Sequence, residues 1–134
     1  MGETSSSRDI VLVVDDNPDT LGFLTETLEA GGAMVLVATG GEQALAIVER
    51  ITPDVVLMDA VMPGMDGFET CRRLKRLAAT ADVPILFMTG LTETEHIVEG
   101  LAAGGVDYVT KPIVLDELTA RIRVHLANAR RERS

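Results

Sequence analysis

Apolar and polar residues follow one another along the chain in blocks that predict a regular succession of strands and helices. Short, nearly continuous apolar runs are typical of strands that are buried on both faces. Between these runs, apolar residues recur at the spacing of one helical turn, which is typical of amphipathic helices. The predicted strands are IVLVV (10–14), MVLVA (34–38), VVLM (55–58), ILFM (85–88) and VDYV (106–109).

Capping and helix-breaking residues mark the ends of the intervening helices. Asn17-Pro18 predicts a helix start, because an Asn side chain caps the first turn and Pro suits the first helical position. Gly31-Gly32 and Gly104-Gly105 predict helix ends, and Pro53 follows another. The apolar positions that mark the helices are Leu21, Leu24 and Leu28; Ala44, Leu45, Ile47, Val48 and Ile51; Phe68, Cys71, Leu74, Leu77 and Ala78; Ile97, Val98, Leu101 and Ala102; and Leu118, Ile122 and Leu126.

This alternation predicts an α/β fold. Five strands, each followed by a helix, indicate a parallel sheet with helices on both faces. Right-handed crossovers favour a doubly wound sheet in the strand order 2-1-3-4-5, in which the first, third and fourth strands lie side by side. The length of 134 residues and the 46% of hydrophobic residues suit one packed domain.

Composition narrows the classes of function. With 12 basic and 21 acidic residues, a net charge of −9 and 3% aromatic residues, this domain is not expected to bind nucleic acid directly. No apolar stretch approaches the roughly 20 residues that span a bilayer. The polar start MGETSSSRD lacks an apolar signal core, and Cys71 is the single cysteine. The chain is therefore predicted to be cytoplasmic, without membrane contact.

Polar side chains follow four of the predicted strands. Asp15-Asp16 follow the first strand, Asp59 the third, Thr89 the fourth and Lys111 the fifth. Singly, each has a structural explanation as a cap, a turn residue or a surface lysine. However, the carboxyl ends of parallel strands border one crevice, and clustered carboxylates repel unless a cation neutralises them. Hard oxygen ligands suit Mg²⁺, so the convergence predicts a site for Mg²⁺ and a phosphoryl group.

Four segments resemble the motifs of one family. They are VVDDN (13–17), VLMDAVMPGMDG (56–67), MTG (88–90) and DYVTKP (107–112). The motifs, their order and their spacing resemble those of the receiver domain of two-component response regulators. The resemblance implies a flavodoxin-like receiver domain over residues 9–127, with a disordered tail at 1–8. The basic tail at 128–134 is interpreted either as the start of a linker to an output domain outside this chain or as the end of a stand-alone regulator.

The resemblance also implies a function, phosphorelay signal transduction. Asp59 would accept a phosphoryl group from a histidine kinase or a phosphotransfer protein. Asp16 would bind Mg²⁺ directly and Asp15 mainly through water. Asp59 and the backbone carbonyl of Val61 would be the remaining protein ligands of the metal.

Further residues match the positions that sense the phosphoryl group in the family. Thr89 and Lys111 would contact the phosphoryl oxygens. The Thr89 hydroxyl would turn toward the acyl phosphate while Tyr108 rotates inward. That movement would shift the surface formed by the fourth helix, the fifth strand and the fifth helix, and so control an output.

The same surface raises the question of self-association. Asp107 and Arg121 match part of the charge pattern by which receivers pair through it, whereas Glu99 and Ala102 do not. Homodimerisation therefore stays open.

Two other functions are weighed against the receiver interpretation. A Mg²⁺-dependent phosphohydrolase of the haloacid-dehalogenase type places Asp-x-Asp after the first strand, whereas this chain has adjacent Asp15-Asp16 there and no insertion that could cap a substrate. A pseudo-receiver that only docks partners would not need all five site residues. Neither His96 nor His125 is followed by an acidic residue, as phosphodonor histidines usually are, and both are expected to be solvated. The chain is predicted to be a phosphoacceptor switch that catalyses only its own phosphorylation and dephosphorylation.

Overall fold

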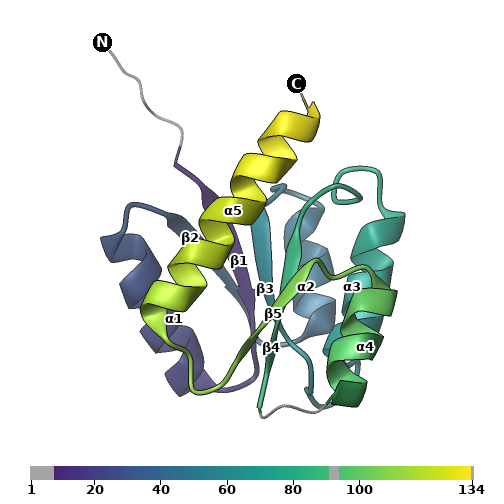
Figure 1. Cartoon of the computed structure of the whole chain (residues 1–134). Helices are drawn as coiled ribbons and strands as arrows, with labels where there is room; N and C mark the ends of the chain where they lie inside the picture. Colours follow the sequence, from purple (N-terminus) through teal and green to yellow (C-terminus); the bar gives the residue numbers. More distant parts are fainter. Residues whose placement is uncertain (1–7, 91–93, 134) are drawn as a thin grey trace.

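Five parallel strands form one sheet in the order β2-β1-β3-β4-β5 (Figure 1). The structure is a computed structural model that describes residues 8–90 and 94–133. The predicted doubly wound, flavodoxin-like α/β fold is confirmed. The strands are β1 (Ile10–Val14), β2 (Met34–Ala38), β3 (Val55–Asp59), β4 (Ile85–Thr89) and β5 (Asp107–Thr110).

Helices cover both faces of the sheet (Figure 1). Helices α1 and α5 pack on one face, and α2, α3 and α4 pack on the other. This arrangement follows from right-handed crossovers that change direction once, after β2. The helices are α1 (Pro18–Ala30), α2 (Gly41–Val48), α3 (Gly67–Arg76), α4 (Thr94–Ala103) and α5 (Leu115–Arg133).

The three central strands are buried on both faces. Because successive strand residues point to opposite sides, Val11 and Val13 pack toward α1 and α5, whereas Leu12 and Val14 pack toward α2 and α3. All residues of β3 and β4 are buried as well. The residues at the ends of these strands are therefore carried by the most rigidly packed part of the domain.

Local capping fixes the helices that start beside those strand ends. The Asn17 side chain accepts a hydrogen bond from the Asp19 amide at 2.8 Å, which confirms the predicted cap of α1. Asp66 caps α3 by accepting from the Glu69 amide at 2.8 Å. Gly67 follows this cap at the point where α3 begins against the backbone of Asp59, and a Cβ there would collide with the Asp59 carbonyl oxygen.

Some apolar residues of the predicted helices are exposed to solvent and do not contribute to the core. Val98 and Leu101 are 60% and 51% exposed. The reason is that α4 meets the sheet through its small residues Gly100 and Ala103, which are buried. Leu77 also lies outside its predicted helix, since the backbone turns extended there and α3 ends at Arg76.

The predicted tails are only partly described. Helix α5 continues to Arg133, so the basic segment at 128–133 extends the helix that begins at Leu115. Residues 1–7 of the predicted N-terminal tail lie outside the described residues. Within residues 8–90 and 94–133, no helix is both long enough and apolar enough to cross a membrane.

Candidate functional site

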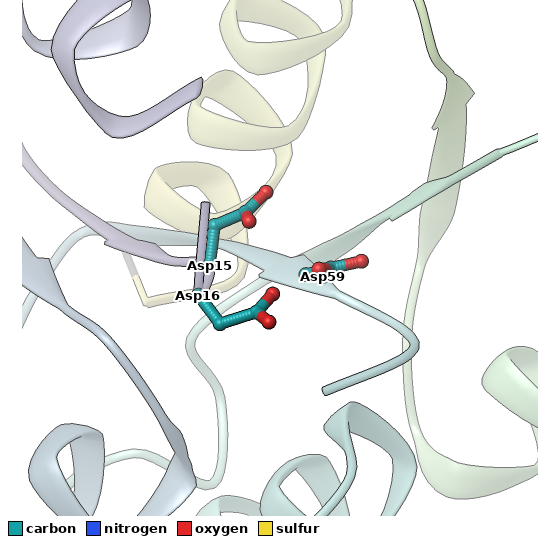
Figure 2. Close-up of side chains that lie close together, drawn as sticks. All are labelled: Asp15, Asp16 and Asp59. Atoms are coloured by element: carbon teal, nitrogen blue, oxygen red, sulfur yellow. The ribbon is translucent and has the colours of Figure 1, made fainter. Parts of the chain in front are cut away.

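Three carboxylates converge at the carboxyl ends of β1 and β3. Asp15 and Asp16 follow β1, and Asp59 ends the neighbouring β3, so parallel pairing of the two strands places them side by side (Figure 2). One oxygen from each carboxylate lies within 4.8 Å of the others. Asp15 and Asp59 are buried, whereas Asp16 is exposed to solvent. The structure thus brings together the three acidic residues predicted from the sequence.

The turn after β1 holds Asp15 in place. Its amide donates to the Ala38 carbonyl of β2 at 3.1 Å, and its side chain accepts from the Asn17 amide at 2.8 Å. One carboxylate oxygen is therefore occupied by the turn that leads into α1. The second oxygen of Asp15 points into the site and is available to a cation.

Lys111 provides that cation in this structure. Its Nζ atom lies 2.9 Å from Asp15 Oδ2 and 3.6 Å from Asp59 Oδ1. Partial burial of Lys111 opposes its charge, but the hydrogen bond to Asp15 and the attraction of Asp59 prevail and raise the pKa of the ammonium group. Lys111 is therefore protonated at neutral pH and bridges the two buried carboxylates.

The Asp59 carboxyl is the most perturbed group of the cluster. Burial and the repulsion from Asp15 raise the pKa of Asp59 to about 6, although Lys111 and a 3.4 Å hydrogen bond from the Val61 amide act in the opposite direction. One lysine thus compensates the local negative charge incompletely. Such a site gains stability from a further cation.

The donor set fits a hard divalent cation. Three carboxylates with oxygens this close offer the ligand type that Mg²⁺ prefers, and exposed Asp16 leaves one side open for metal-bound water. Val61 lies in the loop after β3, with its side chain 63% exposed and its amide directed to Asp59. The roles of the Val61 carbonyl and of the individual carboxylates as metal ligands stay predictions.

The remaining predicted site residues lie on β4 and β5. Thr89 ends β4, is buried, and pairs in register with Thr110 of β5. Its carbonyl accepts from the Lys111 amide at 2.7 Å, so the backbone of Lys111 is tied to the end of β4. The Lys111-Pro112 peptide is cis. Tyr108 is half-buried further down β5, two register pairs below Thr89.

Two features of the structure were not predicted from the sequence. Lys111 lies closer to Asp15 than to Asp59, a preference that no motif spacing encodes. Both histidines are half-buried, so the prediction that they are solvated is wrong. The His96 ring packs at a tilt against the Phe68 ring with centroids 5.8 Å apart, and His125 Nε2 lies 3.0 Å from Asp107 Oδ2.

Asp107 and Arg121 pair with each other within the chain. Arg121 Nη1 lies 2.9 Å from both oxygens of Asp107, which also accepts from the Tyr108 amide at 2.8 Å. Burial alone would raise the pKa of Asp107, but hydrogen bonds from His125, the Tyr108 amide and Arg121 lower it on balance. The two charges that suggested pairing between receivers therefore satisfy each other in the monomer.

Comparison with known proteins identifies the family. The family model of the response regulator receiver domain matches residues 11–123. The chain is 43% identical over 119 residues to the DNA-binding response regulator MtrA of Mycolicibacterium smegmatis, over 89% of this chain and 51% of that protein. It is 35% identical over 116 residues to the DNA-binding dual master transcriptional regulator RpaA of Synechocystis, over 87% of this chain and 48% of that protein.

Solved structures of similar proteins have the same fold as this chain. Chemotaxis protein CheY4 of Vibrio cholerae matches with a TM-score of 0.84 and 31% identity, over 87% of this chain and 98% of that chain. The chain therefore belongs to the receiver domain family of two-component response regulators, which is a family of phosphorelay signalling. Response regulators of this kind interact with histidine kinases. The chain spans about half the length of the curated relatives named above.

Proposed function

We propose that this receiver domain accepts a phosphoryl group on Asp59, with Mg²⁺, from the phosphohistidine of a kinase or phosphotransfer protein. The observation that carries the proposal is that Asp59 belongs to the acidic cluster with Asp15 and Asp16 and also lies 3.6 Å from the Lys111 ammonium. The ionised carboxylate of Asp59 and the incoming phosphoryl group are both negatively charged. Positive charge close to both groups is therefore needed to offset their repulsion. The cluster offers a metal site and a lysine for this purpose.

The transfer is a displacement at phosphorus. An ionised Asp59 oxygen attacks, an O–P bond forms, the P–N bond of the phosphohistidine breaks, and its electron pair returns to the imidazole nitrogen. Asp16, Asp59 and the Val61 carbonyl would hold Mg²⁺ directly, with Asp15 acting mainly through water. When bound, Mg²⁺ supplies positive charge that offsets the carboxylates and the phosphoryl oxygens.

Lys111 changes partner in this proposal. In the unphosphorylated domain its ammonium lies on Asp15, 2.9 Å away. A phosphoryl group on Asp59 would present anionic oxygens to it, and a compact ammonium on a flexible stem can shift to them. The Thr89 hydroxyl, at the end of the adjacent strand, would contact another phosphoryl oxygen.

A groove beside the site suits a protein donor. It has a volume of about 350 Å³ and is lined by Asp19, Thr20, Phe23, Lys111, Pro112 and Ile113. Phe23 on α1 is 47% exposed there. Phe23 lines the groove together with Pro112 and Ile113, and an apolar patch bordered by polar residues is typical of a surface that another protein covers. This feature supports a kinase or phosphotransfer protein as the donor.

The output of the proposed switch is the surface formed by α4, β5 and α5. Thr89 and Tyr108 would report the phosphoryl group to it. An output domain outside this chain and a second copy of the receiver are the partners that this surface could bind, and contact with nucleic acid would belong to such an output domain. We place the chain in the cytoplasm, since its predicted partner presents phosphohistidine there.

We propose that the chain is a phosphoacceptor rather than an enzyme acting on an external substrate. The nucleophile candidate Asp59 ends β3, whereas the two residues after β1 are adjacent acids. No insertion covers the strand ends within the described parts of the chain. The site therefore accommodates a group presented by a partner but does not enclose a small substrate.

Labelling with a small phosphodonor tests the proposal. With phosphoramidate and Mg²⁺, the intact protein should gain the mass of one phosphoryl group, and Asp59→Asn should gain none, because the amide keeps the size but lacks the nucleophilic charge. Asp66→Asn is the matched control, since Asn retains the cap of α3 close to the site. Normal labelling of Asp59→Asn, with phosphate mapped to another residue, would contradict the proposal.

A further inference from the structure

Helix α4 rests on the ring of Phe87. This residue lies in β4, is 3% exposed, and faces the α3–α4 side of the sheet. A Cβ at Gly100 of α4 would lie 2.9 Å from Phe87 Cδ2, and one at Gly105 would lie 2.6 Å from Cε2. Both distances are shorter than real Cβ contacts allow. The helix and its following turn therefore approach the ring this closely only because both positions are glycine.

The ring of Phe87 also packs against α3. The Phe68 ring of α3 lies 5.3 Å from that of Phe87, centroid to centroid, and the His96 ring of α4 packs at a tilt against Phe68. The Gly105 amide donates to the Gly100 carbonyl at 2.9 Å, which fixes the two glycines relative to each other. Phe87 is thus buried against α3 as well as against the two glycines.

Tyr108 is the neighbour of Phe87 across the β4–β5 ladder. The two residues are paired in register, and Tyr108 packs against the same apolar cluster. The space between α4 and these strands is lined by Phe87, Thr89, His96, Ile97, Gly100, Leu101, Asp107 and Tyr108, and it has no room for a water molecule. Thr89 lines this space, so its turn toward the phosphoryl group would vacate part of it. The rest of the phenol ring would then displace one of the remaining walls.

We propose that Phe87 is a positioning residue that converts the inward turn of Tyr108 into a displacement of α4. Because Phe87 is held between Phe68 and the two glycines, the incoming ring pushes against α4, which is the least buried wall of the space. The inference rests on the proposed function, since it takes the Thr89–Tyr108 switch as given. Phe87 is then the residue that makes α4 respond, and its ring is the reason why Gly100 and Gly105 have no side chain.

The decisive variant is Phe87→Leu, which removes volume next to Tyr108 without touching the phosphorylation site. Tyr108 could then turn inward into the vacated space, and α4 would stay in place. The response is measured as the change in backbone amide NMR shifts of Glu99, Gly100 and Ala102 between the free and the phosphoramidate-labelled protein. We expect normal labelling but an α4 response reduced about two-fold or more relative to wild type.

Leu86→Val is the matched control. Leu86 is the buried neighbour of Phe87 in β4 but faces α1 and α5, so its truncation loosens the opposite side of the sheet. The α4 response of this variant should equal that of wild type. An equal loss in Leu86→Val and Phe87→Leu would mean that any core truncation weakens the response, and would overturn the proposal.

A second variant approaches the same contact from the helix. Gly100→Ala adds a methyl group against the Phe87 ring, so α4 should be displaced before phosphorylation and its amide shifts should lie part of the way toward the labelled wild-type values. In Phe87→Leu/Gly100→Ala the methyl group fills the vacated space, and part of the lost response should return. Unchanged α4 shifts in Gly100→Ala would overturn the proposal even if Phe87→Leu failed to fold.

The outcomes distinguish a failure of the proposed function from a failure of the role of Phe87. If the wild type takes no label, the proposed function fails and the inference falls with it. If the wild type is labelled and α4 responds, but Phe87→Leu responds as strongly, the proposed function stands and the role of Phe87 is wrong.

Discussion

The Lys111 ammonium lies nearer to Asp15 than to Asp59, at 2.9 Å against 3.6 Å. The lysine that would receive the phosphoryl oxygens is therefore held by a carboxylate of the proposed metal site. Binding of a divalent cation to the acidic cluster weakens the hold of Asp15 on Lys111, because both cations compete for the same oxygens. Metal binding and release of Lys111 are thus coupled.

Magnesium binding should depend more on Asp16 than on Asp15. Asp16 is predicted to be a direct ligand, and a direct bond contributes more than one through water. Asp15→Ala should weaken binding about ten-fold and Asp16→Ala more, as measured by isothermal titration calorimetry with Mg²⁺, with Asp66→Asn as control. Equal affinities for wild type and both variants would refute the assignment of ligands.

The titration of Asp59 should respond to Asp15 and to metal. Since burial and Asp15 raise the pKa of Asp59 to about 6, the metal-free carboxyl gains its proton as the pH falls through about 6, and only the ionised form is nucleophilic. Carbon-13 NMR of the Asp59 carboxyl should show this midpoint. Asp15→Asn should move it to lower pH by removing a negative neighbour, and saturating Mg²⁺ should do the same by favouring the ionised form. A midpoint unaffected by either change would contradict the electrostatic description.

Asp107 should contribute to stability in a pH-dependent way. Its pKa is lower in the folded state than its ordinary value, so its stabilisation is fully present above the unfolded-state pKa of about 3.9 and is lost as the pH falls through the folded-state pKa. Asp107→Asn should lower the free energy of unfolding by on the order of 1 kcal/mol at neutral pH, since the pair is partly exposed. The difference from wild type, followed by urea denaturation, should shrink in acid. A difference that is independent of pH would assign the effect to packing.

The phosphorylated form should be comparatively long-lived. Hydrolysis needs a water in line with the phosphorus, and in the family the side chains two residues after the phosphoacceptor and after the Thr flank its approach. Here they are Val61, which is exposed beside Asp59, and Leu91, which lies outside the described residues. Neither can hydrogen-bond a water molecule. Val61→Asn/Leu91→Glu should speed decay of the labelled protein several-fold after donor removal; an unchanged decay rate would show that these residues do not set the lifetime.

The sequence predicted the strands and the composition of the site because both depend on local pattern. A buried parallel strand appears as an apolar run, and the residues after Val14, Met58 and Met88 must then lie at one edge of the sheet. The outward direction of Val98 and Leu101 could not be predicted in the same way. It depends on where α4 can approach the sheet, and that is decided by Phe87, a residue in a different element.

The sequence also does not predict which charged side chains pair with each other. Asp107 and Arg121 stood out as charges suited to contacts between receivers, yet they are bonded to each other across β5 and α5. His125 joins them one helical turn further along α5. Such contacts depend on the rotation of α5 about its axis, which is set by the packing of the whole helix on the sheet.

Gly100, which lies inside α4 against the Phe87 ring, also affects the stability of the helix itself. A glycine inside a helix costs about 1 kcal/mol relative to alanine, and Ala103 is the largest buried residue among those whose burial is described in α4, whereas α1 buries three leucines. We therefore expect the amides of α4 to exchange with solvent deuterium sooner than those of α1. A helix with a lower free energy of opening changes its arrangement in response to a smaller difference in free energy. Helix α4 would then respond more readily than α1 to phosphorylation of the nearby site.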